Sequence, residues 1–179
     1  MTVPHQSHGR TASSRTARLP PHGPQLARIT PGLEPSLIDN TQLTIESLDP
    51  DNPRRYRIAV AGPAALLVAK ATKIEERHAE LAAGKKDRVK TKDSVDCLRL
   101  LTAVETDQLV DGFERHRDGA QAEQVSRQAL AYFTKQLERG EADDVRLGII
   151  RELDDVVMAS SYSALIEDLL ESCRRNNLL

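Results

Sequence analysis

The chain has 179 residues, of which 39% are hydrophobic, 29% charged and 3% aromatic, with no Trp and two Cys. This length suits one domain that buries about two-thirds of its unfolded surface and needs no disulfide or structural metal. Cys97 and Cys173 lie in no zinc-site spacing, and no apolar run approaches the roughly 20 residues that span a bilayer. We therefore expect a cytoplasmic protein with no membrane contact, and we exclude secreted disulfide scaffolds.

Charge is distributed unevenly along the chain. Residues 1–31 carry four arginines and no acidic residue, together with five of the nine prolines, and every aromatic residue follows position 55. A segment so poor in large apolar groups cannot offset the entropy lost on ordering. We predict that residues 1–36 form a disordered basic leader and that residues 37–179 form the folded domain. The alternative use of the leader is as an arm that contacts nucleic acid.

A small β-hairpin is predicted at the start of the folded domain. Residues 42–48 alternate polar and apolar, which places Leu43 and Ile45 on one half-buried face, and residues 56–60 can form the second strand. The prolines, Asp and Asn of residues 49–53 are typical of a turn. Asp49 and Asp51 could instead hold a divalent cation, since two carboxylates one residue apart can converge on a hard ion.

Everything after Gly62 has the periodicity of helices. Gly62-Pro63 is a helix start signal, Lys85 to Lys90 form a basic connector, and Thr91 is a candidate cap. Helices are predicted at about 64–83, 92–104, 106–117, 120–139, 142–158 and 162–174, the fifth with an apolar stripe of Val145, Ile149, Leu153 and Val156 or Val157. Short links imply antiparallel neighbours. The fold class is therefore mainly α, a small β-hairpin followed by a bundle of five to six helices, with the hairpin packed at one end.

The first long helix carries a lysine at the edge of its buried face. Lys70 lies beside the stripe of Leu67 and Ile74, and Arg77 lies two turns along. On the second helix, Asp93 and Asp96 share one face with apolar neighbours. In a structural interpretation, Lys70 pairs with one of these carboxylates and holds two antiparallel helices in register.

A functional interpretation of the same residues is phosphoryl or nucleotidyl transfer. Here Lys70, with Lys73 or Arg77, binds phosphates, while an aspartate deprotonates the attacking hydroxyl. The two interpretations stay open from the residues alone, because buried ion pairs also occur for purely structural reasons.

These residues also carry a resemblance to a known family. Residues 60–74, Arg88 and the stretch Lys92-Asp93-Ser-Val-Asp96-Cys-Leu-Arg-Leu-Leu resemble the second half of the AbiEii-like nucleotidyltransferases, which include toxins of toxin–antitoxin systems. The resemblance covers about residues 32–104 and includes the Thr44-Ile-Glu-Ser-Leu-Asp-Pro segment. It implies that Lys70 contacts a nucleoside triphosphate, that Asp93 is the base or organiser of the site, and that Asp96 supports its helix. For intact members it implies Mg²⁺, an NTP and an acceptor such as tRNA.

The sequence also departs from that family. Its members have an N-terminal half with a Gly-Ser helix start and an Asp-x-Asp strand that positions metal ions, and residues 1–40 contain neither. We therefore expect the tail half of such a protein behind an unrelated basic leader, catalytically incomplete but retaining the Lys/Asp side of an NTP site.

Two alternatives to this function stay open. One is an active nucleotidyltransferase toxin whose metal carboxylates come from Asp49 and Asp51 or from a partner. The other is a helical module that binds a protein such as an antitoxin through an apolar face left uncovered.

Overall fold

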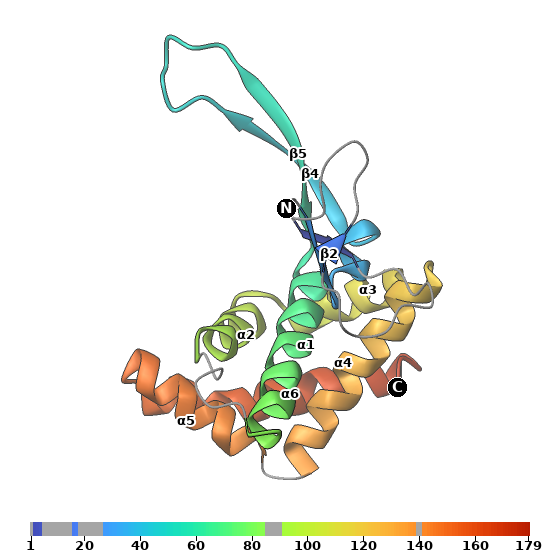
Figure 1. Cartoon of the computed structure of the whole chain (residues 1–179), viewed down its shortest axis with the longest axis vertical. Coiled ribbons are helices and arrows are strands. Elements are labelled where there is room, and N and C mark those ends of the chain that lie inside the picture. Colours follow the sequence, from blue (N-terminus) through green and yellow to red (C-terminus); the bar gives the residue numbers. More distant parts are fainter. Residues whose placement is uncertain (1, 5–15, 18–26, 85–90, 139–140) are drawn as a thin grey trace.

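Six α-helices and a long β-hairpin make up most of the described part of the chain (Figure 1). The structure is a computed structural model that describes residues 2–4, 16–17, 27–84, 91–138 and 141–179, with side chains for 30–84, 91–138 and 145–179. In chain order its elements are the strands β1 (Thr2–Pro4), β2 (Thr16–Ala17) and β3 (Ala27–Thr30), the 3₁₀ helix η1 (Glu34–Leu37), the hairpin strands β4 (Asn40–Glu46) and β5 (Arg55–Ala61), and the helices α1 (Pro63–Ala82), α2 (Thr91–Ala103), α3 (Thr106–His116), α4 (Ala120–Glu138), α5 (Glu141–Leu153) and α6 (Val156–Arg175). The mainly helical class, with a hairpin preceding six helices, is confirmed.

Helix α1 lies at the centre of the helical body and packs against α2, α3 and α4 (Figure 1). It begins as the Gly62-Pro63 signal predicts, with Gly62 as N-cap and Pro63 in the first turn, where its missing N–H is no loss. Its apolar stripe, which includes Leu67, Val68 and Ile74, is buried in one continuous core shared with all the other helices. This burial holds α1 rigidly, so polar side chains along its remaining face have defined positions.

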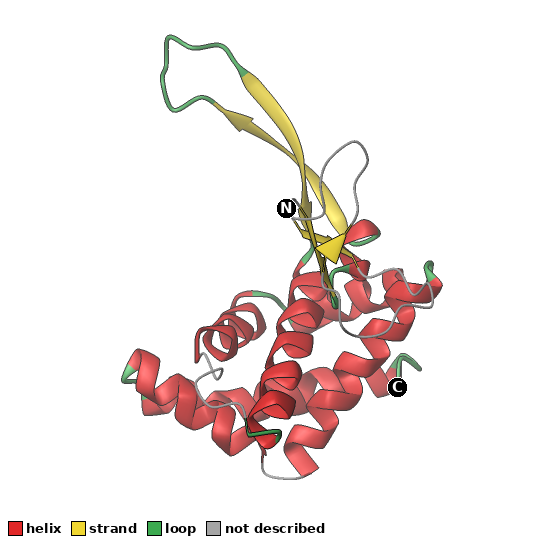
Figure 2. Ribbon diagram, viewed as in Figure 1, coloured by secondary structure: helices red, strands yellow, loops and turns green. Residues whose placement is uncertain are grey.

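The hairpin projects away from the helices instead of packing on them, which corrects one prediction (Figure 2). Strands β4 and β5 are antiparallel, with Asn40 opposite Ala61 and Glu46 opposite Arg55. The face that we expected to be half-buried is open, since Leu43 is 49% and Ile45 48% exposed. The alternating pattern predicts the strand correctly, but an alternating pattern does not ensure that a partner covers the apolar side.

The base of the hairpin is fastened to the helices by Asp39. Its carbonyl oxygen accepts a hydrogen bond from Gly62 N over 2.8 Å, and its carboxylate accepts one from Ala65 N over 3.1 Å, at the N-terminus of α1. A Cβ on Gly62 would lie 2.2 Å from Asp39 Oδ1, so this approach requires glycine. Arg115 Nη2 of α3 donates to the same carboxylate over 2.7 Å. Asp39 thus caps α1 from a distance and joins it to α3.

Ionisation of Asp39 should make the free energy of unfolding depend on pH in the acidic range. Burial alone would raise its pKa, but contacts with His116, Arg115 and the Ala65 amide outweigh burial and lower the pKa from 3.8 to about 2. The ionised form is favoured in the folded state, so the contribution is complete above pH 3.8 and is lost as the pH falls toward 2. We expect about 2 kcal/mol to be lost across this window. Urea unfolding of the wild type and of Asp39→Asn at pH 5, 4, 3 and 2 checks this: the difference between them should shrink with pH, and a constant difference would contradict it.

Two predicted boundaries differ in the structure. The fifth helix ends at Leu153 rather than 158, and the sixth begins at Val156 rather than 162, because Asp154 adopts a positive φ of 52° and Asp155 caps α6 by accepting from Met158 N. Val156 and Val157 consequently lie on the exposed first turn of α6, outside the stripe in which we had placed one of them. Asp tolerates this left-handed conformation better than most residues, and a helical period cannot show such a break.

Part of the predicted leader lies within the described residues. Three short strands and all but the last residue of η1 fall within residues 1–36, and Glu34 is buried, accepting a hydrogen bond from Gly32 N over 2.8 Å. The rest of the predicted leader, at 1, 5–15 and 18–26, and the basic connector of residues 85–90 lie outside the described residues. None of the helices in the described ranges is long and apolar enough to cross a membrane.

Candidate functional site

Side chains of α1 and α2 meet in an ion-pair cluster. Lys70 Nζ donates to Asp96 Oδ2 over 2.6 Å and to Asp93 Oδ1 over 3.2 Å. Arg77 Nη1 forms an ion pair with the other oxygen of Asp93. Lys70 and Arg77 are two turns apart on one face of α1, and the two aspartates are one turn apart on α2. The structure therefore brings together four of the five residues that the sequence singled out, and we call them the Lys70 cluster.

The Lys70 cluster is partly shielded from water. The side chain of Asp93 is 12% exposed and that of Arg77 is 15% exposed, whereas Lys70 retains 28%. Burial lowers the pKa of Lys70, but the hydrogen bonds from its ammonium to Asp96 and Asp93 and their charges outweigh burial, so the net pKa is raised. Lys70 is thus a cation at neutral pH, and the open edge of its ammonium is where an anion could approach.

Lys73 does not join the cluster. Its Nζ donates to Glu76 Oε2 over 2.9 Å along α1, since it lies to one side of the face that meets α2. Arg99, which the sequence analysis did not select, lies 3.5 Å from Asp96 Oδ1 on the same helix. The i, i+3 spacing of Asp96 and Arg99 could have indicated this contact.

The first turn of α2 lies at the cluster. Asp93 is in that turn, and Thr91 belongs to the helix instead of preceding it; its hydroxyl donates to Glu152 Oε2 over 2.8 Å. The N-terminus of a helix carries a partial positive charge and free amides, which favour carboxylates and phosphates. The partial positive charge at the N-terminus of α2 stabilises the carboxylate of Asp93, and it would also favour a phosphate bound beside Lys70.

The residues present do not fit a Mg²⁺ site. Both carboxylates of the Lys70 cluster face the ammonium of Lys70, and a cation cannot occupy the space between them while Lys70 is charged. Asp49 and Asp51 lie in the turn at the hairpin tip, where Asp49 Oδ1 accepts from the Asp51 amide. Across the described ranges, no group of three or more His, Cys, Asp or Glu side chains could hold a metal ion.

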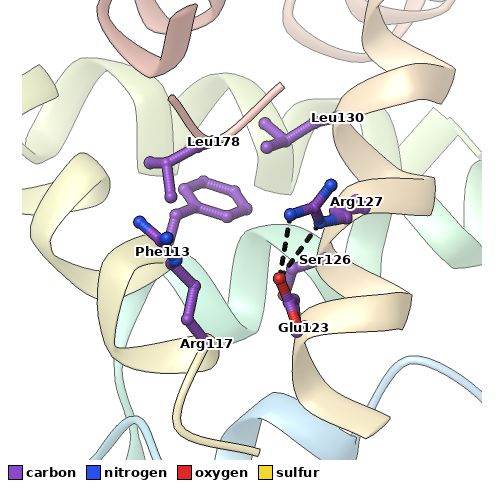
Figure 3. A pocket seen from close by; sticks show the side chains of 7 residues that line it. All are labelled: Phe113, Arg117, Glu123, Ser126, Arg127, Leu130 and Leu178. Atoms are coloured by element: carbon purple, nitrogen blue, oxygen red, sulfur yellow. Dashed lines mark hydrogen bonds and ion pairs between the residues drawn. The ribbon is translucent and has the colours of Figure 1, made fainter. Parts of the chain in front are cut away.

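Two pockets of the described structure lie away from the Lys70 cluster. One, between α3, α4 and the C-terminal tail, is lined by Phe113, Arg117, Glu123, Ser126, Arg127, Leu130 and Leu178 (Figure 3). Its free volume of about 10 Å³ holds at most one water molecule. A shallow groove of about 420 Å³ includes Glu75, Tyr132 and Lys135, between α1 and α4. Neither of these two pockets is lined by a residue of the Lys70 cluster.

Sequence reasoning missed a second polar cluster around Asp39. Besides Arg115, the carboxylate faces His116, whose Nε2 lies 3.5 Å from Oδ2, an electrostatic contact too long for a strong hydrogen bond. The other ring nitrogen of His116 lies 2.7 Å from Ser126 Oγ, and both side chains are buried. Asp39 stands alone before a strand, so no spacing in the sequence connects it with residues 76 positions away. Ser126 lies within α4, where its own amide is used by the helix, so the arrangement fastens helices and offers no oxyanion-binding amides.

Comparison of the chain with known protein families, with curated proteins and with solved structures found no match.

Proposed function

We propose that this chain is a nucleotidyltransferase-like protein that is catalytically incomplete and retains the Lys/Asp side of an NTP site. The observation that carries the proposal is the convergence of Lys70 and Arg77 from α1 with Asp93 from the first turn of α2. The sequence resemblance gives Lys70 a triphosphate-binding role and Asp93 an organising role, and the position of Arg77 two turns from Lys70 makes it a second candidate for phosphate binding. Their meeting across two separate helices is what that role requires of the fold.

The charge arrangement supports phosphate binding at the open edge of Lys70. A triphosphate would compete with Asp96 for the ammonium, because Asp96 makes the shorter of its two hydrogen bonds. Exchange of one anionic partner for another costs less than removing a buried cation from all partners. The same competition predicts weak affinity, since an ammonium already paired gains little from a second anion.

Catalytic incompleteness is supported by the position of Asp49 and Asp51. A strand of seven residues spans roughly 23 Å, and these two aspartates lie at the far end of the hairpin, whose near end joins α1 (Figure 1). They cannot converge with Lys70 on one metal ion within this chain. The alternative of an active toxin would therefore need carboxylates from a partner.

We predict that NTP binding depends on Lys70. Calorimetry with each of the four NTPs, with and without Mg²⁺, should give weak binding to the wild type and about tenfold weaker binding to Lys70→Ala. Asp93→Ala should also weaken binding, because Arg77 and the first turn of α2 lose their organising partner. Lys92→Ala is the matched control, since Lys92 is an exposed lysine next to Asp93 on α2.

Equal binding by the wild type, Lys70→Ala and Lys92→Ala would contradict the retained site. Catalysis is tested separately by incubating the folded protein with labelled NTPs and total tRNA, where we expect no label on the RNA. Transfer of label would overturn the incompleteness part of the proposal while leaving the binding part intact.

A further inference from the structure

The hairpin has one face without charge. From the register of β4 and β5, Leu43 lies opposite Ile58 and Ile45 opposite Tyr56. Side chains alternate between the two faces of a strand, so Thr41 and Val60 share this side with them. We call these six residues the apolar hairpin face. The opposite face carries Glu46 and Arg55, which form an ion pair of 3.2 Å, and Arg57.

Among the described residues, none covers the apolar hairpin face. Its four large side chains are between 40% and 59% exposed, with Tyr56 the most open. Together they present about 400 Å² of accessible surface, within the range of the largest patch on a typical monomer, a patch that is often functional. A two-stranded hairpin alone is at best marginally stable in water, and stability normally requires packing against a further layer. The projecting hairpin therefore needs an occupant for this face.

We infer that the occupant is the apolar hairpin face of a second copy of this chain. A two-fold contact places the same six residues against themselves, and because none is charged, no like charges meet. The Glu46–Arg55 pair stays in water on the outside of both hairpins. Nucleic acid is disfavoured on this face, since it offers no cation to a phosphate.

The size and position of the face set the strength of the contact. Two copies would bury about 800 Å² from these four side chains and more from Thr41 and Val60, which is close to the lower limit for a specific interface, so the dimer is weak and depends on protein concentration. The hairpin projects beyond the helices, which leaves room for a second hairpin to pack antiparallel to it with the two helical bodies at opposite ends (Figure 2). This inference does not depend on nucleotide binding, because the Lys70 cluster lies on the helical body.

Sedimentation equilibrium of the full chain over a wide range of concentrations tests the dimer. The wild type should rise from the monomer mass of 19.8 kDa toward twice that value. Leu43→Lys, which places an unpaired charge in the contact, should raise the dimer dissociation constant at least about tenfold. Gln42→Lys is the matched control, since the preceding residue of the same strand lies on the other face, opposite Ala59, and is also exposed; its dissociation constant should match the wild type.

Both variants change exposed residues, and circular dichroism of each variant checks that it is folded. A wild type that stays monomeric throughout, or equal dimerisation of Leu43→Lys and wild type, would overturn the inference. Flotation with phosphatidylcholine vesicles tests a lipid surface as the occupant. A wild type that is monomeric and floats with the vesicles, while Leu43→Lys does not, would assign the face to a lipid surface and overturn the dimer.

Discussion

Replacing Asp39 by Ala should lower the free energy of unfolding by about 3 kcal/mol, the largest loss we expect from any exchange of a polar residue. The change removes the carboxylate that accepts from Ala65 N and from Arg115, and leaves the N-terminus of α1 without its acceptor. Loss of a helix cap costs about 1–2 kcal/mol and loss of a hydrogen bond to a charged group about 1.5–3 kcal/mol. For a chain of this length the melting temperature should fall by about 6–12 °C.

Thermal and urea unfolding at pH 7 measure this effect. Asp51→Ala is the control, because Asp51 is an exposed aspartate at the hairpin tip whose loss should change stability by less than about 0.5 kcal/mol. Similar losses for the two variants would show that Asp39 does not connect the hairpin base to α1 and α3.

Replacing Asp93 by Ala should cost about 2–3 kcal/mol. The substitution leaves Arg77 beside an empty position and removes one of the two carboxylates that Lys70 contacts. Breaking a fully buried ion pair costs about 3–5 kcal/mol, and the value here is smaller because Lys70 is partly exposed and keeps Asp96.

The matched control is Asp107→Ala. Asp107 is an exposed aspartate in the first turn of α3, as Asp93 is in the first turn of α2, so both variants lose the same interaction with the helix dipole. The difference between their losses in free energy of unfolding therefore measures the contribution of the ion pairs of Asp93. A double-mutant cycle of Asp93→Ala with Lys70→Met should give a coupling of about 1 kcal/mol, and a coupling near zero would show that the Lys70 cluster does not join α1 and α2.

The two clusters differ in how far the sequence could predict them. Lys70 stands at the edge of a buried stripe and its partners occupy one face of the next helix, so helical geometry alone predicts that they can meet. The i, i+3 spacing of Lys73 and Glu76 allows their contact as well, but it does not show that Lys73 pairs along its own helix instead of across to α2. Asp39 has no periodic context, and its partners on α3 lie 76 residues away.

For the hairpin too, the sequence predicts one feature and leaves another open. The alternation of residues 42–48 and the Asp-Pro-Asp-Asn-Pro turn predict two antiparallel strands, and the strands are found at 40–46 and 55–61. Whether Leu43 and Ile45 are covered depends on what packs beside them, and the pattern of a strand contains no information about its neighbours.

By itself, then, the sequence determined the elements: Gly62-Pro63 begins α1, and the apolar periods place the helices, because these signals act within a few residues. Only the tertiary structure decided which charges pair, where Asp39 is buried, that Asp154 separates α5 from α6, and that the hairpin stands away from the helices. These features depend on contacts between residues far apart in the chain, or on a single backbone conformation, and neither leaves a repeating pattern in the sequence.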